Sequence, residues 1–141
     1  VIKNEMMVSW SYNYDKICFE LSAPTKGWLA IGFNKKSTLS GNYLLMGRVT
    51  NSGPQITEHF TISPGNYQSI KSLGGRELVT DVTGKDILGK STIKFSIPFV
   101  KEDHYRKNLK KGQKYFMIMA FSRVDDFQHH SVMRTMVEVT L

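Results

Sequence analysis

Apolar and polar residues alternate with a period of two along much of this chain, which is typical of strands with one buried face. The first such segment places five apolar side chains on one face: Met6, Val8, Trp10, Tyr12 and Tyr14. The same alternation recurs in four later segments: 17–22, 56–62, 92–99 and 133–141. We expect each segment to form a strand, with Asp15 and Lys16 in a tight turn between the first two.

Two further segments, 27–33 and 115–121, are apolar at consecutive positions, and residues 43–46 begin a third. This pattern predicts central strands that are covered on both faces. Trp28 lies in the first of these segments, so we expect it to be a core residue rather than an exposed platform.

Clusters of turn-forming residues separate the expected strands. They occupy residues 52–54, 63–66, 74–75 and 84–86. No window has a convincing helical period, and no linker or internal repeat interrupts the chain. Short strands separated by glycine and proline turns indicate one all-β domain over residues 1–141, built as a sandwich or barrel.

Composition excludes several classes of protein. The chain has 141 residues and a formal net charge of +7, but its densest basic run, residues 101–111, also contains Glu102 and Asp103. We expect that run to be a solvated loop or short helical turn, and we expect no nucleic-acid partner. No apolar run is long enough to span a membrane. Because the chain has a single cysteine, Cys18, a cysteine-based zinc site is excluded. We expect Cys18 to pack in the core.

Five segments, taken in order, resemble the DOMON family, which includes domains of dopamine β-monooxygenase-like proteins and the cytochrome domain of cellobiose dehydrogenase. The first segment, 27–34, reads GWLAIGFN and resembles the family's glycine-tryptophan strand. The others are 39–47, 56–60, 92–98 and 119–130, and the last ends at His130. The resemblance covers nearly the whole chain.

This resemblance implies an immunoglobulin-like antiparallel β-sandwich located outside the cytoplasm, in the periplasm, at the cell surface or secreted. Family members bind haem or sugar, and the cytochrome members hold b-type haem between a methionine and a histidine. The histidine position corresponds to His130, with His129 as the fallback ligand, and the methionine position corresponds to Leu39. Met46 is expected near the pocket wall.

Leucine offers no lone pair to iron, so the chain departs from the cytochrome pattern at one of two ligands. A bound haem b is then expected to be five-coordinate on His130, or to take its sixth ligand from elsewhere. Asp125 and Asp126 precede the two histidines, and their carboxylates could orient an imidazole or cap backbone N–H groups of the loop. A zinc site would need three or four converging ligands, and His59 and His104 could contribute only if the fold brought them there.

Three functions stay open at this point, and none is enzymatic, because the sequence has no nucleophile elbow, phosphate loop or metalloprotease helix. The first is a haem-binding module for electron transfer or haem sensing, with a redox protein as partner. The second is a module that binds carbohydrate or another small ligand on an aromatic face drawn from Trp10, Tyr12, Tyr14, Tyr43 and Tyr67. The third is a protein-interaction domain of an envelope assembly.

Overall fold

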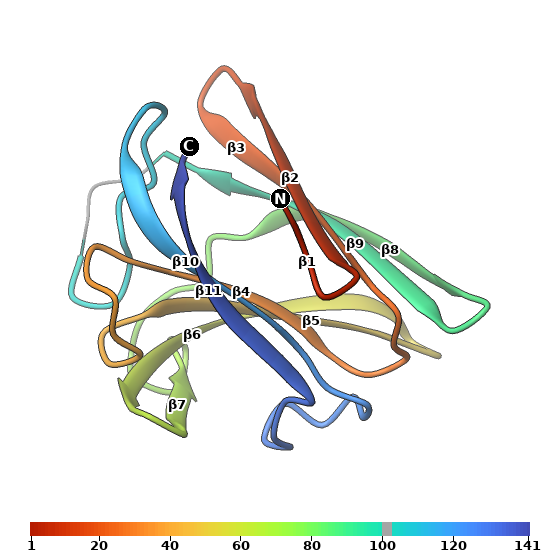
Figure 1. Ribbon diagram of the computed structural model, residues 1–141. Helices are drawn as coiled ribbons and strands as arrows, with labels where there is room; N and C mark the ends of the chain where they lie inside the picture. The colour runs from red at the N-terminus through yellow and green to blue at the C-terminus, as the bar shows by residue number, and fades with distance from the viewer. Residues whose placement is uncertain (100–102) are drawn as a thin grey trace.

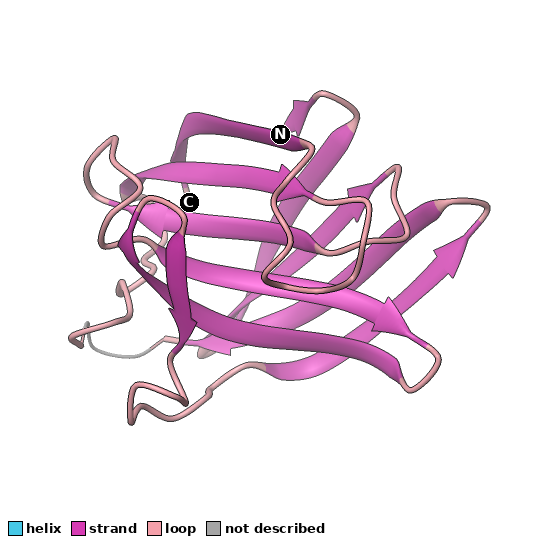
Figure 2. Cartoon of the chain, turned by 90° about the horizontal axis from the view of Figure 1, so that it is seen from below, coloured by secondary structure: helices cyan, strands magenta, loops and turns pink. Residues whose placement is uncertain are grey.

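The computed structural model describes residues 1–99 and 103–141. Within these residues the chain forms strands and no helix, arranged as two antiparallel sheets that pack face to face (Figures 1 and 2). The strands are β1 (Ile2–Lys3), β2 (Met6–Asn13), β3 (Lys16–Ala23), β4 (Leu29–Asn34), β5 (Tyr43–Thr50), β6 (Gly53–Ser63), β7 (Asn66–Ser69), β8 (Thr80–Ile87), β9 (Lys90–Pro98), β10 (Lys114–Phe121) and β11 (Met133–Thr140). The expected all-β antiparallel sandwich is confirmed. None of the described residues belongs to a helix that could cross a membrane.

One sheet has the order β1-β2-β3-β9-β8 and the other the order β11-β10-β4-β5-β6-β7. Apolar side chains from the facing surfaces form the main core between them. The ring centroid of Phe19, on the five-stranded sheet, lies 5.5 Å from that of Phe33 on the six-stranded sheet. Burial of these alternating side chains is the main stabilising contribution, at about 25 cal/mol per Å² of apolar surface.

Strands β4 and β10 lie side by side in the six-stranded sheet, with Gly32 opposite Ile118. Every residue of β4 is buried, and so is nearly all of β10. The sequence expectation of two central strands covered on both faces is confirmed. Because the second sheet covers only one face, other groups must cover the outer face of β4 and β10.

Residues 84–86 were expected to form a turn, and this expectation is wrong, because they lie inside β8. Gly84 serves close packing there: an added Cβ would approach the carbonyl oxygen of Thr92 to 2.9 Å and Cβ of Pro54 to 3.0 Å. A glycine inside a strand often marks such a close approach rather than a turn. The turn instead follows β8, at Leu88 and Gly89, which both have positive φ angles.

Other local expectations need smaller corrections. Tyr14 does not share the buried face of β2, because it lies in the β2–β3 turn with φ of 36° and its side chain is fully exposed. That turn therefore falls one residue earlier than expected. Cys18 is half-buried rather than a full core residue. Of the basic run 101–111, residues 103–111 form a loop and turn, and Lys101 and Glu102 lie outside the described residues.

A buried ion pair holds the segment before β10 against the edge of the six-stranded sheet. Nε of Arg106 donates to Oε1 of Glu58 over 3.0 Å, and both side chains are almost completely buried. The hydroxyl of Tyr43 donates to the same carboxylate oxygen over 2.5 Å, and the backbone N–H of Leu78 donates to Oε2 over 2.6 Å. Burial, and then the charge of Glu58, raise the pKa of Tyr43 well above its usual value, so its hydroxyl stays protonated and can donate.

Candidate functional site

A second apolar cluster lies on the outer face of the six-stranded sheet, away from the main core. Its buried members are Trp28, Ala30, Leu44, Met46, Ile118, Ala120 and Phe127, with Leu39, Tyr67 and Met136 packed against them. Strand alternation produces this cluster, because β4, β5 and β10 are apolar at the positions that face outward as well as inward. The outer face is therefore a covered surface and not a solvated one.

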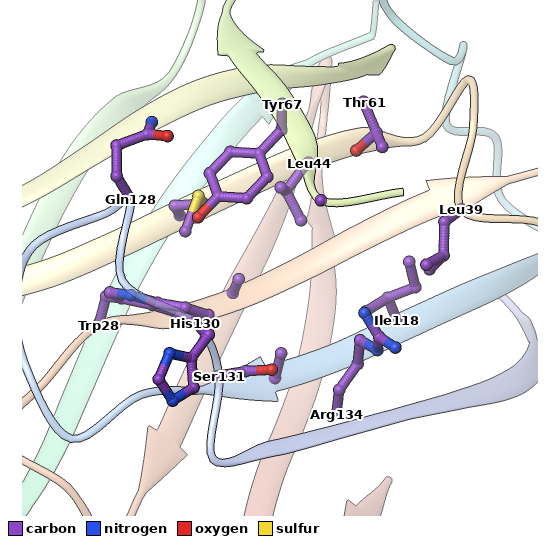
Figure 3. A pocket seen from close by; sticks show the side chains of 14 residues that line it. Trp28, Leu39, Leu44, Thr61, Tyr67, Ile118, Gln128, His130, Ser131 and Arg134 are labelled. Carbon is purple, nitrogen blue, oxygen red and sulfur yellow. The ribbon is translucent and has the colours of Figure 1, made fainter. Parts of the chain in front are cut away.

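Above this cluster lies a pocket of about 210 Å³, which we call the outer-face pocket (Figure 3). Its floor consists of apolar side chains of β4, β5 and β10, and its walls come from loops and from β7 and β11. Its lining residues are Trp28, Ala30, Leu39, Leu44, Met46, Thr61, Gly65, Tyr67, Ile118, Ala120, Gln128, His130, Ser131 and Arg134. An apolar floor with a few polar wall groups is the usual composition of a small-ligand site.

His130 lies on the wall of the outer-face pocket, in the loop between β10 and β11. The backbone around it is anchored twice to the sheet. Nε1–H of Trp28 donates to the carbonyl oxygen of His129 over 3.1 Å, and the hydroxyl of Ser122 donates to the carbonyl oxygen of His130 over 3.0 Å. The imidazole of His130 makes no hydrogen bond with any described residue, so its nitrogens are available to a ligand.

His129 does not line the outer-face pocket, and its ring stacks on that of His130 with centroids 4.4 Å apart. The two aspartates do not orient either ring in this structure. Asp126 accepts the backbone N–H of Gln128 over 2.9 Å, and the carbonyl oxygen of Asp125 accepts Nη1 of Arg48 over 2.9 Å. Of the two roles considered for Asp126, its contact in the structure is the capping of a backbone N–H group of the loop.

Leu39 lines the pocket from the loop between β4 and β5. That loop meets the sheet at the end opposite to the His130 loop, because Phe121 pairs with Leu29 at the start of β4. Met46 is almost completely buried in the pocket floor. The structure thus brings His130, Leu39 and Met46 to one pocket, with His129 immediately behind His130.

On its β7 side the pocket is bordered by a hydrogen-bonded contact between Tyr67 and Phe127, which we call the strap. The hydroxyl of Tyr67 donates to the carbonyl oxygen of Phe127, which joins β7 to the His130 loop. Burial, and then the charge of Asp126, raise the pKa of Tyr67. The buried ring of His59 packs edge-on against both Tyr67 and Phe127, with centroids 5.7 Å apart in each case. Burial lowers the pKa of His59, so the strap rests on a neutral imidazole.

Sequence reasoning missed several wall residues, among them Tyr67 as a strap, Gln128, Ser131 and Arg134. Arg134 could have been found from strand parity, because Met133 and Val137 pack toward the main core and Arg134 must then face outward. Tyr67 lies in β7, which is too short to give a periodic pattern.

The aromatic face expected for a carbohydrate does not form. Trp10 and Tyr12 pack against the main core, Tyr43 is buried within it, and Tyr14 stands alone in a turn. Tyr67 alone faces the outer-face pocket. Across the part of the chain that the structure describes, no group of histidine, cysteine and acidic side chains could hold a metal ion.

The outer-face pocket fits a haem held by one histidine better than one held by two protein ligands. The imidazole of His130 is exposed at the rim of the pocket and makes no hydrogen bond with any described residue, and the floor beside it is apolar. Leu39 supplies no donor atom from the other end, and Met46 is enclosed in the floor. The residues present would therefore offer a haem one donor side chain, His130, and no methionine at residue 39.

These features define a class: a β-sandwich with a pocket on the outer face of one sheet and a loop histidine in its wall. A family model of the DOMON domain matches residues 2–122, and the chain belongs to that family. Residues 123–141, which contain His129, His130 and Arg134, lie beyond the match. The fold is similar to the crystal structure of the cytochrome b domain of pyranose dehydrogenase from Coprinopsis cinerea. That comparison has a TM-score of 0.65 and 14% identity, and covers 89% of this chain and 68% of the other.

Proposed function

We propose that this DOMON domain is an extracytoplasmic binding module that holds a b-type haem in the outer-face pocket, with His130 as the protein's ligand to iron. One observation carries the proposal: the unpartnered imidazole of His130 stands in the wall of an apolar pocket. The similarity in fold to a cytochrome b domain supports it. The extracytoplasmic location follows the usual setting of DOMON domains.

His130 is suited to this role by its environment. Anchors from Trp28 and Ser122 fix the backbone of residues 129 and 130 and leave the side chain unbonded. A fixed backbone lowers the entropy that is lost when the imidazole takes up one orientation at a ligand.

Leu39 determines which kind of haem protein this would be. When bound, haem b supplies an iron centre that changes oxidation state and takes small ligands. Because Leu39 has no donor atom, a haem held by His130 would take any second ligand from another residue or from outside the protein. Such a site would favour the binding of small ligands over fast electron transfer.

Haem titration followed by visible absorption tests the proposal. Wild type should give a shifted Soret band with a stoichiometry of one. His130→Ala should weaken binding by at least about tenfold, which corresponds to about 1.4 kcal/mol, and His129→Ala should retain it. The proposal fails if wild type gives no Soret shift, and the site assignment fails if both histidine variants bind as wild type does.

A second candidate is a module for a small apolar ligand without iron, and Leu39 favours it because the methionine of the cytochrome members is replaced. The apolar floor would serve such a ligand equally well. A wild-type protein that binds metal-free porphyrin as tightly as haem would favour this function, because iron would then add nothing to the affinity.

A further inference from the structure

Arg134, an exposed residue in the wall of the outer-face pocket, is a cation without a partner among the residues that the structure describes. It lies on β11 opposite Ala120, which is opposite Ala30 on β4, and both alanines belong to the pocket floor. Its guanidinium forms no hydrogen bond or ion pair with any described residue. Arg48 and Arg106, by contrast, are bound to Gln55 and Glu58. Arg134 is therefore free to pair with a ligand.

The side chain of Arg134 extends over the floor on the opposite side of the pocket from His130 (Figure 3). Its guanidinium is directed toward Ile118, on the side where Leu39 closes the pocket. The two polar ends of the pocket thus carry different chemistry. His130 offers imidazole ring nitrogens at one end, and Arg134 offers a positive charge with several N–H donors at the other.

A second observation marks the same end of the pocket as polar. Asn42 is fully buried, and neither Nδ2 nor Oδ1 of its amide has a hydrogen-bond partner. Its amide lies over Gly32, since a Cβ added to Gly32 would collide with Oδ1. Gly32 pairs with both Ile118 and Leu44, which line the pocket. Asn42 does not itself line the pocket, so its amide makes this end more polar from beneath the surface.

We propose that Arg134 binds a carboxylate of the ligand in the outer-face pocket. The inference deepens the proposed function and rests on the pocket being the ligand site. Guanidinium and carboxylate pair through two parallel hydrogen bonds, which gives both affinity and orientation. An apolar floor beside that cation selects a ligand with an apolar body and an acidic edge. Haem b has this chemistry, as do metal-free porphyrins and long-chain fatty acids.

The test separates iron from carboxylate by using four porphyrin probes: haem, protoporphyrin IX and the dimethyl ester of each. Each is titrated into wild type, Arg134→Gln, Arg134→Lys and His130→Ala. Arg123→Gln is the matched control, because Arg123 is exposed and does not line the pocket. Dodecanoate is added as an acid with a different apolar body. Absorption and porphyrin fluorescence report affinity in each case.

Arg134→Gln should lower the affinity for protoporphyrin IX and haem by roughly three- to tenfold, the range for a partly exposed charged pair. Arg134→Gln should leave the affinity for the dimethyl esters unchanged. Arg134→Lys should retain part of the affinity for the free acids that Arg134→Gln loses. Equal affinity of wild type and Arg134→Gln for the free acids overturns the inference, as does an equal loss for acids and esters.

The two proposals fail in different ways. If iron adds nothing and His130→Ala has no effect, but Arg134→Gln weakens protoporphyrin IX, the haem proposal fails and the carboxylate site stands. If haem binds through His130 and Arg134→Gln binds it equally, the carboxylate site alone fails. If no porphyrin binds, dodecanoate decides: affinity lost in Arg134→Gln supports the site, and no binding overturns it.

Discussion

The indole Nε1–H of Trp28 donates a hydrogen bond of 3.1 Å to the backbone carbonyl oxygen of His129. The same tryptophan therefore fills the outer apolar cluster and holds the loop that carries His130. Its backbone takes part as well, because its N–H donates to Val124 and its carbonyl accepts Ser122. The sheet thus positions His130, the candidate iron ligand, through the side chain of Trp28, whose ring is buried and whose Nε1–H is hydrogen-bonded.

We predict that Trp28→Phe and Trp28→Ala separate these two roles. Trp28→Phe keeps most of the buried ring and loses the hydrogen bond, so it should cost about 1–2 kcal/mol. Trp28→Ala should cost about 3–5 kcal/mol, as large aromatic truncations in cores do. Urea unfolding measures both, and hydrogen exchange of residues 123–131 should rise in Trp28→Phe. Unchanged exchange in that loop would show that the indole does not anchor it.

The buried pair of Glu58 and Arg106 gives a second prediction. Glu58→Gln leaves the buried Arg106 guanidinium with only the half-exposed carboxylate of Asp103, 3.1 Å from its Nη1, as counter-charge, so it should cost up to about 3–5 kcal/mol in urea unfolding. The double variant Glu58→Gln with Arg106→Met should recover part of that loss, because it removes the buried guanidinium and keeps an amide oxygen that can accept from the Tyr43 hydroxyl. Glu20→Gln is the matched control, since Glu20 and Lys94 form an exposed pair of 3.5 Å and its loss should cost under about 1 kcal/mol. Equal costs for Glu58→Gln and Glu20→Gln would contradict the prediction.

His59 predicts a pH dependence of stability. Burial depresses its pKa in the folded state, whereas the unfolded chain should titrate near 6.5. The contribution of neutral His59 is therefore complete above about pH 6.5 and is lost as the pH falls through the folded pKa. Wild type should lose stability between pH 7 and pH 5, and His59→Gln should lose less. His104→Gln, at an exposed histidine, should show the same pH dependence of stability as wild type. The prediction is contradicted if that pH dependence is unchanged in His59→Gln and reduced in His104→Gln.

Strand alternation was enough to predict the sandwich, because one-residue parity decides which side chains meet the core. It failed for β7 and β8 for different reasons. β7 is too short to establish a period. β8 is an edge strand whose exposed polar residues, with Gly84 among them, resemble a turn until its close contact with Thr92 is known.

The site was predictable only where local sequence carries it. His130, Leu39 and Met46 were identified by resemblance to the family, and all three line one pocket. The placement of Tyr67, Asn42 and Arg134 in or beside the pocket depends on pairings between strands that are distant in sequence, which a single sequence does not contain. Asp126 shows that nearness in sequence does not establish a contact. Its position suggested a partner for histidine, but its carboxylate accepts a backbone N–H two residues away.

Leu39 provides the last prediction, which concerns the second axial position. If haem binds through His130, Leu39→Met places a thioether at the position where the cytochrome members have their methionine ligand. The substitution nearly conserves volume, so it should change stability by less than about 1.5 kcal/mol. Absorption of the haem-loaded variant should then change toward a six-coordinate, low-spin spectrum. Leu44→Met is the matched control, because Leu44 lies in the pocket floor on β5 and should leave the spectrum unchanged. A Leu39→Met spectrum identical to wild type would mean that the β4–β5 loop does not bring residue 39 to the iron, and the departure at this position would then carry no functional weight.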